Sequence, residues 1–174
     1  MRNSIFIIAL FCLMFTALAA EEWKVYTNAE LGYTISYPNG FETQIVQNVF
    51  TATMLSEESI IPVTLSVTSD LVKAEDMKGD FDQNAAKFLE DIRKEMEGSG
   101  LEIVVEENTK IKYKGMDAMS IRMSLDMMMF KMKMGTLVFY VGDRMYMMMM
   151  GASDADFEAY LPVFEQFKDS LVFK

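Results

Sequence analysis

The sequence has no histidine, one cysteine and three prolines among its 174 residues. Histidine is the usual general base, the usual activator of a nucleophile and the commonest ligand of transition metals, so its absence excludes the common forms of these chemistries. The single cysteine, Cys12, excludes an intramolecular disulfide and the usual structural zinc sites. We therefore expect a protein without catalytic residues and without a cofactor, stabilised by its apolar core.

Basic residues are also scarce, with 16 Lys and Arg against 26 Asp and Glu, which gives a formal net charge of −10. Binding to nucleic acid depends on clustered positive charges that neutralise phosphates. Lys110, Lys112 and Lys114 alternate along one segment, and the solvated edge of a sheet accounts for them. We expect no nucleic-acid partner.

Residues 1–20 have the three parts of a secretory signal peptide. Arg2 supplies the positive charge, Ile5 to Phe15 form an almost unbroken apolar run, and Ala17-Leu18-Ala19-Ala20 supply small residues for cleavage near Ala19 or Ala20. The run is shorter than the roughly 20 apolar residues of a transmembrane helix. Lipidation at Cys12 is the other alternative, although the bulky Phe11 stands where lipoprotein signals have a small residue. We predict a periplasmic or extracellular protein with no membrane span after cleavage.

Residues 21–174 contain no linker and are expected to form a single domain. Four segments alternate between apolar and polar residues, which predicts antiparallel strands with one covered face: residues 33–37, 50–54, 63–68 and 119–127. Residues 137–141 and 145–150 are apolar on both faces and are typical of central strands, with Gly142-Asp143 as the hairpin turn between them. The turn between residues 126 and 132 stays open, since no Gly or Pro marks it.

Two helices are expected beside these strands. A stripe with helical spacing runs from Phe81 to Met96 and stops at Gly98-Ser99-Gly100. Ser153 and Asp156 form a capping pair that opens a second helical segment, in which Pro162 predicts a kink or two short helices. The expected fold class is α+β: an antiparallel sheet flanked by helices on both faces, an α/β/α sandwich.

Three phrases of the sequence resemble the PsbP-like family, which comprises the extrinsic photosystem II protein and bacterial relatives of unassigned function. They are Leu31–Phe41 (LGYTISYPNGF), Gly142–Tyr146 (GDRMY) and Asp169–Phe173 (DSLVF), and they span nearly all of residues 21–174. The resemblance implies an α/β/α sandwich around an antiparallel sheet and no catalytic residues. The photosynthetic members bind metal at positions that include histidine, so no metal site is carried over to this chain.

Acidic residues offer no recognisable site. Asp154-x-Asp156-x-Glu158 is similar to the start of a calcium loop but lacks its glycine and its distal glutamate, and acids at a helix N-terminus explain it. A carboxylate-dependent enzyme would need two acids that converge in one pocket, with at least one displaced pKa.

Methionine is unusually abundant: 16 of the 18 follow residue 20, and 13 lie between Met116 and Met150. The first interpretation is core packing, because methionine is a flexible apolar filler. The second is an adaptable partner-binding surface that includes Met127, Met129 and Met149. The third is a Cu(I) site formed by Met132, Met134, Met145 and Met147, because thioethers prefer soft metals.

The sequence therefore predicts an exported, non-catalytic binding or accessory protein. Its sheet would engage an unknown protein or a small apolar ligand. Soft-metal binding through the methionine-rich strands is the alternative function.

Overall fold

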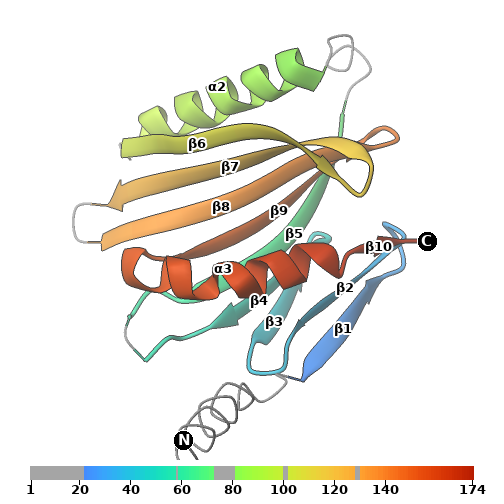
Figure 1. The fold of residues 1–174 in the computed structure, drawn as a ribbon, viewed down its shortest axis with the longest axis horizontal. Helices are drawn as coiled ribbons and strands as arrows, with labels where there is room; N and C mark the ends of the chain where they lie inside the picture. Colours follow the sequence, from blue (N-terminus) through green and yellow to red (C-terminus); the bar gives the residue numbers. More distant parts are fainter. Residues whose placement is uncertain (1–21, 58, 73–80, 100–101, 128–129) are drawn as a thin grey trace, which may run out of the picture.

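The computed structural model describes residues 22–57, 59–72, 81–99, 102–127 and 130–174, which form two antiparallel sheets and two helices (Figure 1). The larger sheet has seven strands in the order β3 (Glu42–Val46), β4 (Val49–Met54), β5 (Val63–Leu71), β9 (Arg144–Ser153), β8 (Phe130–Val141), β7 (Met116–Met127) and β6 (Glu102–Tyr113). The smaller sheet has the order β1 (Trp23–Asn28), β2 (Tyr33–Pro38) and β10 (Val172–Phe173). The helices are α2 (Phe81–Ser99) and α3 (Asp154–Asp169). Residues 1–20, and with them the predicted leader and Cys12, lie outside the described residues.

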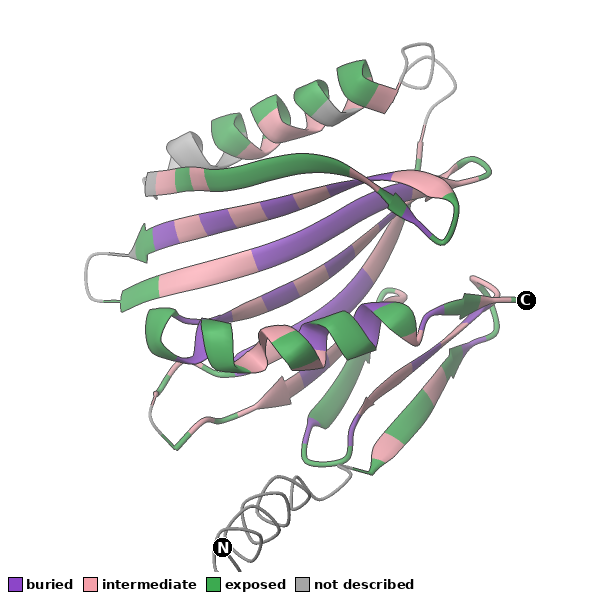
Figure 2. Cartoon of the chain, in the orientation of Figure 1, coloured by how far each residue is buried: buried purple, intermediate pink, exposed green. Residues whose placement is uncertain are grey.

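The two segments that are apolar on both faces lie at the centre of the larger sheet, as predicted. β9 and β8 are its fourth and fifth strands, and a turn at Gly142-Asp143 joins them. Gly142 has a φ of 61°, a left-handed conformation that glycine adopts at little cost. Exposed positions gather instead on the outer strands β1, β3 and β6 (Figure 2).

Alternation along the central strands divides the core into two clusters. Leu137 and Phe139 belong to the larger cluster together with Phe157, Phe164 and Phe167 of α3. Val138, between them in the sequence, belongs to the smaller cluster, which also contains three residues of β7: Met119, Ile121 and Met123. Phe81, Phe88 and Leu89 of α2 pack against this smaller cluster.

The α+β class, with antiparallel sheets and two helices, is thus confirmed, but the expectation of one sheet is wrong. The first strands fold into a separate sheet because β2 pairs with β1 and with the C-terminal β10, rather than with the larger sheet. The apolar patterns of the sequence do not predict β1, β3 or β10, and only Lys110 and Lys112 indicated β6.

The alternative of two short helices at Pro162 is also wrong, because α3 is one continuous helix from Asp154 to Asp169. Proline removes one backbone hydrogen bond and costs about 3 kcal/mol inside a helix. Pro162 lies on the exposed side of α3, whereas Phe157, Phe164 and Phe167 are at most 3% exposed. Burial of these rings stabilises the helix on both sides of the proline. The predicted cap is present, since the Ser153 hydroxyl accepts a hydrogen bond from the backbone N–H of Asp156 at 3.1 Å.

The three phrases of the PsbP-like resemblance meet in space. Phe173 pairs with Tyr33 across β10 and β2, and Ser170 Oγ accepts a hydrogen bond from the Ser36 backbone at 2.9 Å. The ring centroid of Tyr146 lies 4.9 Å from that of Phe173 and 6.4 Å from that of Tyr33. The phrases are therefore parts of one aromatic cluster that joins the two sheets.

Candidate functional site

One face of the larger sheet carries the methionine-rich pattern. On β7, β8 and β9, the residues that point away from α3 include seven methionines, here called the methionine face: Met119, Met123, Met132, Met134, Met145, Met147 and Met149. The other side of the same strands packs on α3 through residues such as Leu137, Phe139 and Met148. The period of two along each strand produces this separation.

The methionine face is only partly covered. Met119 and Met123 are each 3% exposed and belong to the cluster on which α2 packs. Met132, Met134, Met145, Met147 and Met149 are half-buried. The face continues onto β5 with small polar residues, since Ser66 is paired with Met149 and Thr68 with Met147. Met119 and Met123 thus belong to the core and Met145 and Met147 pack against it, whereas Met132, Met134 and Met149 are half-buried outside that cluster.

The methionines of the predicted Cu(I) set fall into two separate pairs. Met134 lies opposite Gly151, whereas Met147 lies opposite Val138, four residues further along β8. At roughly 3.3 Å per residue, the two positions are about 13 Å apart along the strands. The pair Met132 and Met134 therefore does not lie beside the pair Met145 and Met147.

The predicted partner surface is described in part. Met149 is half-buried on the methionine face. Met127 ends β7, although its side chain is not described, and Met129 lies outside the described residues. β7 ends at Met127 and β8 begins at Phe130, which brackets the turn that the sequence left open. The sequence analysis did not include Met123 among the candidate site residues, although Met123 pairs directly with Met134. The apolar alternation of residues 119–127 could have indicated that Met123 lies on the same face.

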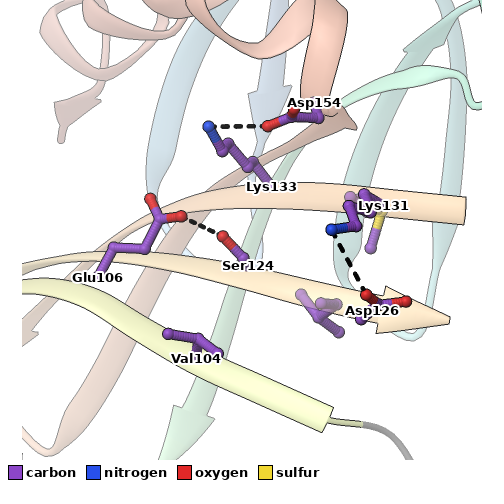
Figure 3. A pocket seen from close by; sticks show the side chains of 9 residues that line it. Val104, Glu106, Ser124, Asp126, Lys131, Lys133 and Asp154 are labelled. Carbon is purple, nitrogen blue, oxygen red and sulfur yellow. Dashed lines mark hydrogen bonds and ion pairs between the residues drawn. The ribbon is translucent and has the colours of Figure 1, made fainter.

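A cavity of about 330 Å³ opens at the end of β6, β7 and β8 beside the start of α3 (Figure 3). Its charged side chains form contacts with one another. Lys133 Nζ lies 2.8 Å from Asp154 Oδ1, Lys131 Nζ lies 3.7 Å from Asp126 Oδ2, and Ser124 donates a hydrogen bond to Glu106. The three carboxylates of the cavity, those of Glu106, Asp126 and Asp154, thus each have a different partner.

The electrostatics of this cavity do not favour acid–base chemistry. The hydrogen bond from Lys133 lowers the pKa of Asp154, and the same contact raises the pKa of Lys133. Each group is held in its charged form at neutral pH, whereas a general acid needs a carboxyl whose pKa is raised. Within the described residues, no group of three or more His, Cys, Asp or Glu side chains could hold a metal ion.

No family model and no curated protein matches the sequence. Solved structures do match, and they define the class as α+β proteins with the PsbP-like fold. The cyanobacterial PsbP, CyanoP, from Synechocystis sp. PCC 6803 has a TM-score of 0.63 and 12% identity, over 91% of this chain and 96% of CyanoP.

Two bacterial proteins are similar to the same extent. PA94 from Pseudomonas aeruginosa, a protein of unknown function, has a TM-score of 0.61 and 14% identity, over 88% of this chain and 98% of its own. LpqN from Mycobacterium tuberculosis, involved in cell envelope biogenesis, has a TM-score of 0.60 and 10% identity, over 88% of this chain and 91% of its own. The PsbP-like resemblance is confirmed at the level of the fold, and none of the three is described as an enzyme.

Proposed function

We propose that this chain is an exported, non-catalytic binding protein that holds an apolar segment of another protein on its methionine face. The observation that carries the proposal is the partial cover of that face: five methionines of β8 and β9 are half-buried at the centre of the larger sheet. A purely structural role would favour complete burial of such apolar side chains.

We also infer that α2 and α3 lie on opposite faces of the larger sheet, so that α2 is the cover that leaves part of the methionine face open. Two features support this arrangement. Phe88 and Leu89 pack against the cluster of Val138, whereas Phe157 and Phe164 belong to the cluster of Leu137 and Phe139. Neighbouring strand residues point to opposite faces.

Methionine suits such a surface because its unbranched thioether side chain adapts to partners of different shape. On β8, the positions from Met132 to Val138 that lie on the methionine face carry no charged side chain. Export is supported by the signal-peptide pattern of residues 1–20, and LpqN, which shares the fold, is involved in cell envelope biogenesis. None of the described helices is both long enough and apolar enough to cross a membrane.

Photo-crosslinking in the cell that makes the protein tests this function. A photoreactive residue at position 149 should give a discrete adduct with one partner, and Met134→Lys in the same chain should abolish it by placing a charge on the apolar surface beside position 149. The matched control is position 25, because Val25 is 67% exposed but lies on β1 of the other sheet. Equal adducts at the two positions, or none at position 149, would contradict the proposal.

A further inference from the structure

We propose that four thioethers of the methionine face, those of Met123, Met132, Met134 and Met149, form a binding site for a soft monovalent cation, Cu(I). This set differs from the one that the sequence suggests, because it depends on the pairing of three strands. It goes beyond the docking function proposed above and does not require it.

The strand register makes Met123, Met132 and Met149 neighbours of Met134, although Met132 and Met149 are themselves four residues apart in register. Met123 of β7 is the direct cross-strand partner of Met134, which places the two Cβ atoms about 4.5–5.5 Å apart. Met149 of β9 is the diagonal neighbour of Met134, since Met149 lies opposite Thr136. Diagonal neighbours are about 7–8 Å apart and within reach of long side chains. Met132 lies two residues before Met134 on β8 and shares its face.

Gly151 provides the space in which these thioethers can meet. It lies directly opposite Met134 on β9 and has no side chain. The Met132 sulfur occupies this space, 3.9 Å from the position that a Cβ atom at Gly151 would take. Met132 therefore leans across the strand pair toward β9, on the side where Met149 lies.

The surroundings of the cluster select for a soft ion. The neighbouring positions on the same face are uncharged: Ile121, Leu125, Thr136 and Ser66. The Thr136 hydroxyl is buried and makes no hydrogen bond within the described part of the chain. Hard cations require several carboxylate or carbonyl oxygens, whereas thioethers select Cu(I).

Access and charge are also suitable for a cation. Met132, Met134 and Met149 are half-buried, so an ion can reach them from solvent, whereas Met123 is 3% exposed and forms the floor of the cluster. The chain as a whole carries a formal net charge of −10, which raises the local concentration of cations.

Competition for Cu(I) with a chromogenic chelator, under reducing conditions and on the purified exported protein, tests the site. The wild type should withdraw one equivalent of Cu(I) from the chelator. The double variant Met132→Leu/Met134→Leu should bind at least tenfold more weakly, because leucine keeps the apolar volume but has no sulfur. Met145→Leu/Met147→Leu is the matched control and should bind as the wild type does, because it removes two thioethers from the same face outside the cluster.

Methyl resonances of 13C-labelled methionine, recorded with Ag(I) as a redox-stable probe, give a second measurement. Addition of Ag(I) should shift the signals of Met123, Met132, Met134 and Met149 and leave Met145 in place. No withdrawal of Cu(I) by the wild type, or equal weakening in both double variants, would overturn the proposal. The Cu(I) competition uses the purified protein without a partner, whereas crosslinking at position 149 needs a partner and no metal, so failure of the metal site is distinguishable from failure of the docking function.

Discussion

At the scale of single residues, Tyr33 shows how far the tertiary structure changes side-chain chemistry. It is fully buried, and its ring centroid lies 6.2 Å from that of Tyr26 and 6.5 Å from that of Phe173. Burial raises the pKa of its hydroxyl from 10.0 to about 12, because the phenolate loses its hydration. Burial also raises the pKa of Tyr113, whose hydroxyl donates a hydrogen bond to the Lys168 carbonyl.

This pKa shift predicts a loss of stability in alkaline solution. Between about pH 10 and pH 12 the unfolded chain releases the Tyr33 proton while the folded chain retains it, so the free energy of unfolding falls as the pH rises. Its contribution is fully present below pH 10. Tyr33→Phe should make the decline shallower, and Tyr113 should account for part of what remains. Urea unfolding at a series of pH values measures the slope, and an unchanged slope in Tyr33→Phe would contradict the account.

At the scale of elements, the close approach of α3 to the sheet depends on Gly135. A Cβ atom at this position would lie 3.3 Å from Cε1 of Phe164 and 3.5 Å from Cζ of Phe157. Both rings belong to the buried side of α3. Because Gly135 has no side chain, the two aromatic rings can pack directly over β8.

We expect Gly135→Ala to lower the free energy of unfolding by about 1–3 kcal/mol, because the helix must shift to admit the methyl group. Gly151→Ala is the matched control on the neighbouring strand. Its Cβ would meet only the Met132 sulfur, at an ordinary 3.9 Å. Urea unfolding of both variants measures the difference, and equal losses would show that the approach of α3 is not the cause.

At the scale of the whole molecule, the prediction that residues 1–20 are a cleaved leader can be compared with the strands at the two ends of the described residues. The N-terminal β1 and the C-terminal β10 both pair with β2, so the two ends of this part of the chain belong to one sheet. Cleavage of the predicted leader near Ala19 or Ala20 would therefore leave the paired strands intact, since β1 begins at Trp23.

Expression in a host with a secretory pathway should accordingly release a chain that begins at residue 20 or 21. Intact-mass measurement of the exported protein checks this expectation. The matched control is a chain in which Ala17 and Ala19 are replaced by Leu, because signal peptidase requires small residues there. An exported wild-type protein that retains Met1 to Ala20, or one of mass increased by a lipid on Cys12, would contradict cleavage at this site.

Strand identity was largely predictable from the sequence, because a strand shows its period locally. Val63, Leu65 and Val67 alternate with polar residues and form β5, and the unbroken apolar segments became the central β8 and β9. β1, β3 and β10 were missed; the residues of β3 are all exposed and give no pattern. The alternative of two short helices at Pro162 was wrong, because local propensity carries no information about the burial of Phe157 and Phe164.

The sequence by itself determined the secondary-structure periods, the hairpin at Gly142, the cap at Ser153 and the exclusion of histidine and thiolate chemistry. Each of these depends on residue type or on neighbours a few positions away. Only the tertiary structure decided that Tyr33 meets Phe173, that the described residues form two sheets, and that Met123 lies beside Met134. Backbone hydrogen bonds between strands carry no side-chain signature, so which strands pair follows from the packing of the whole chain.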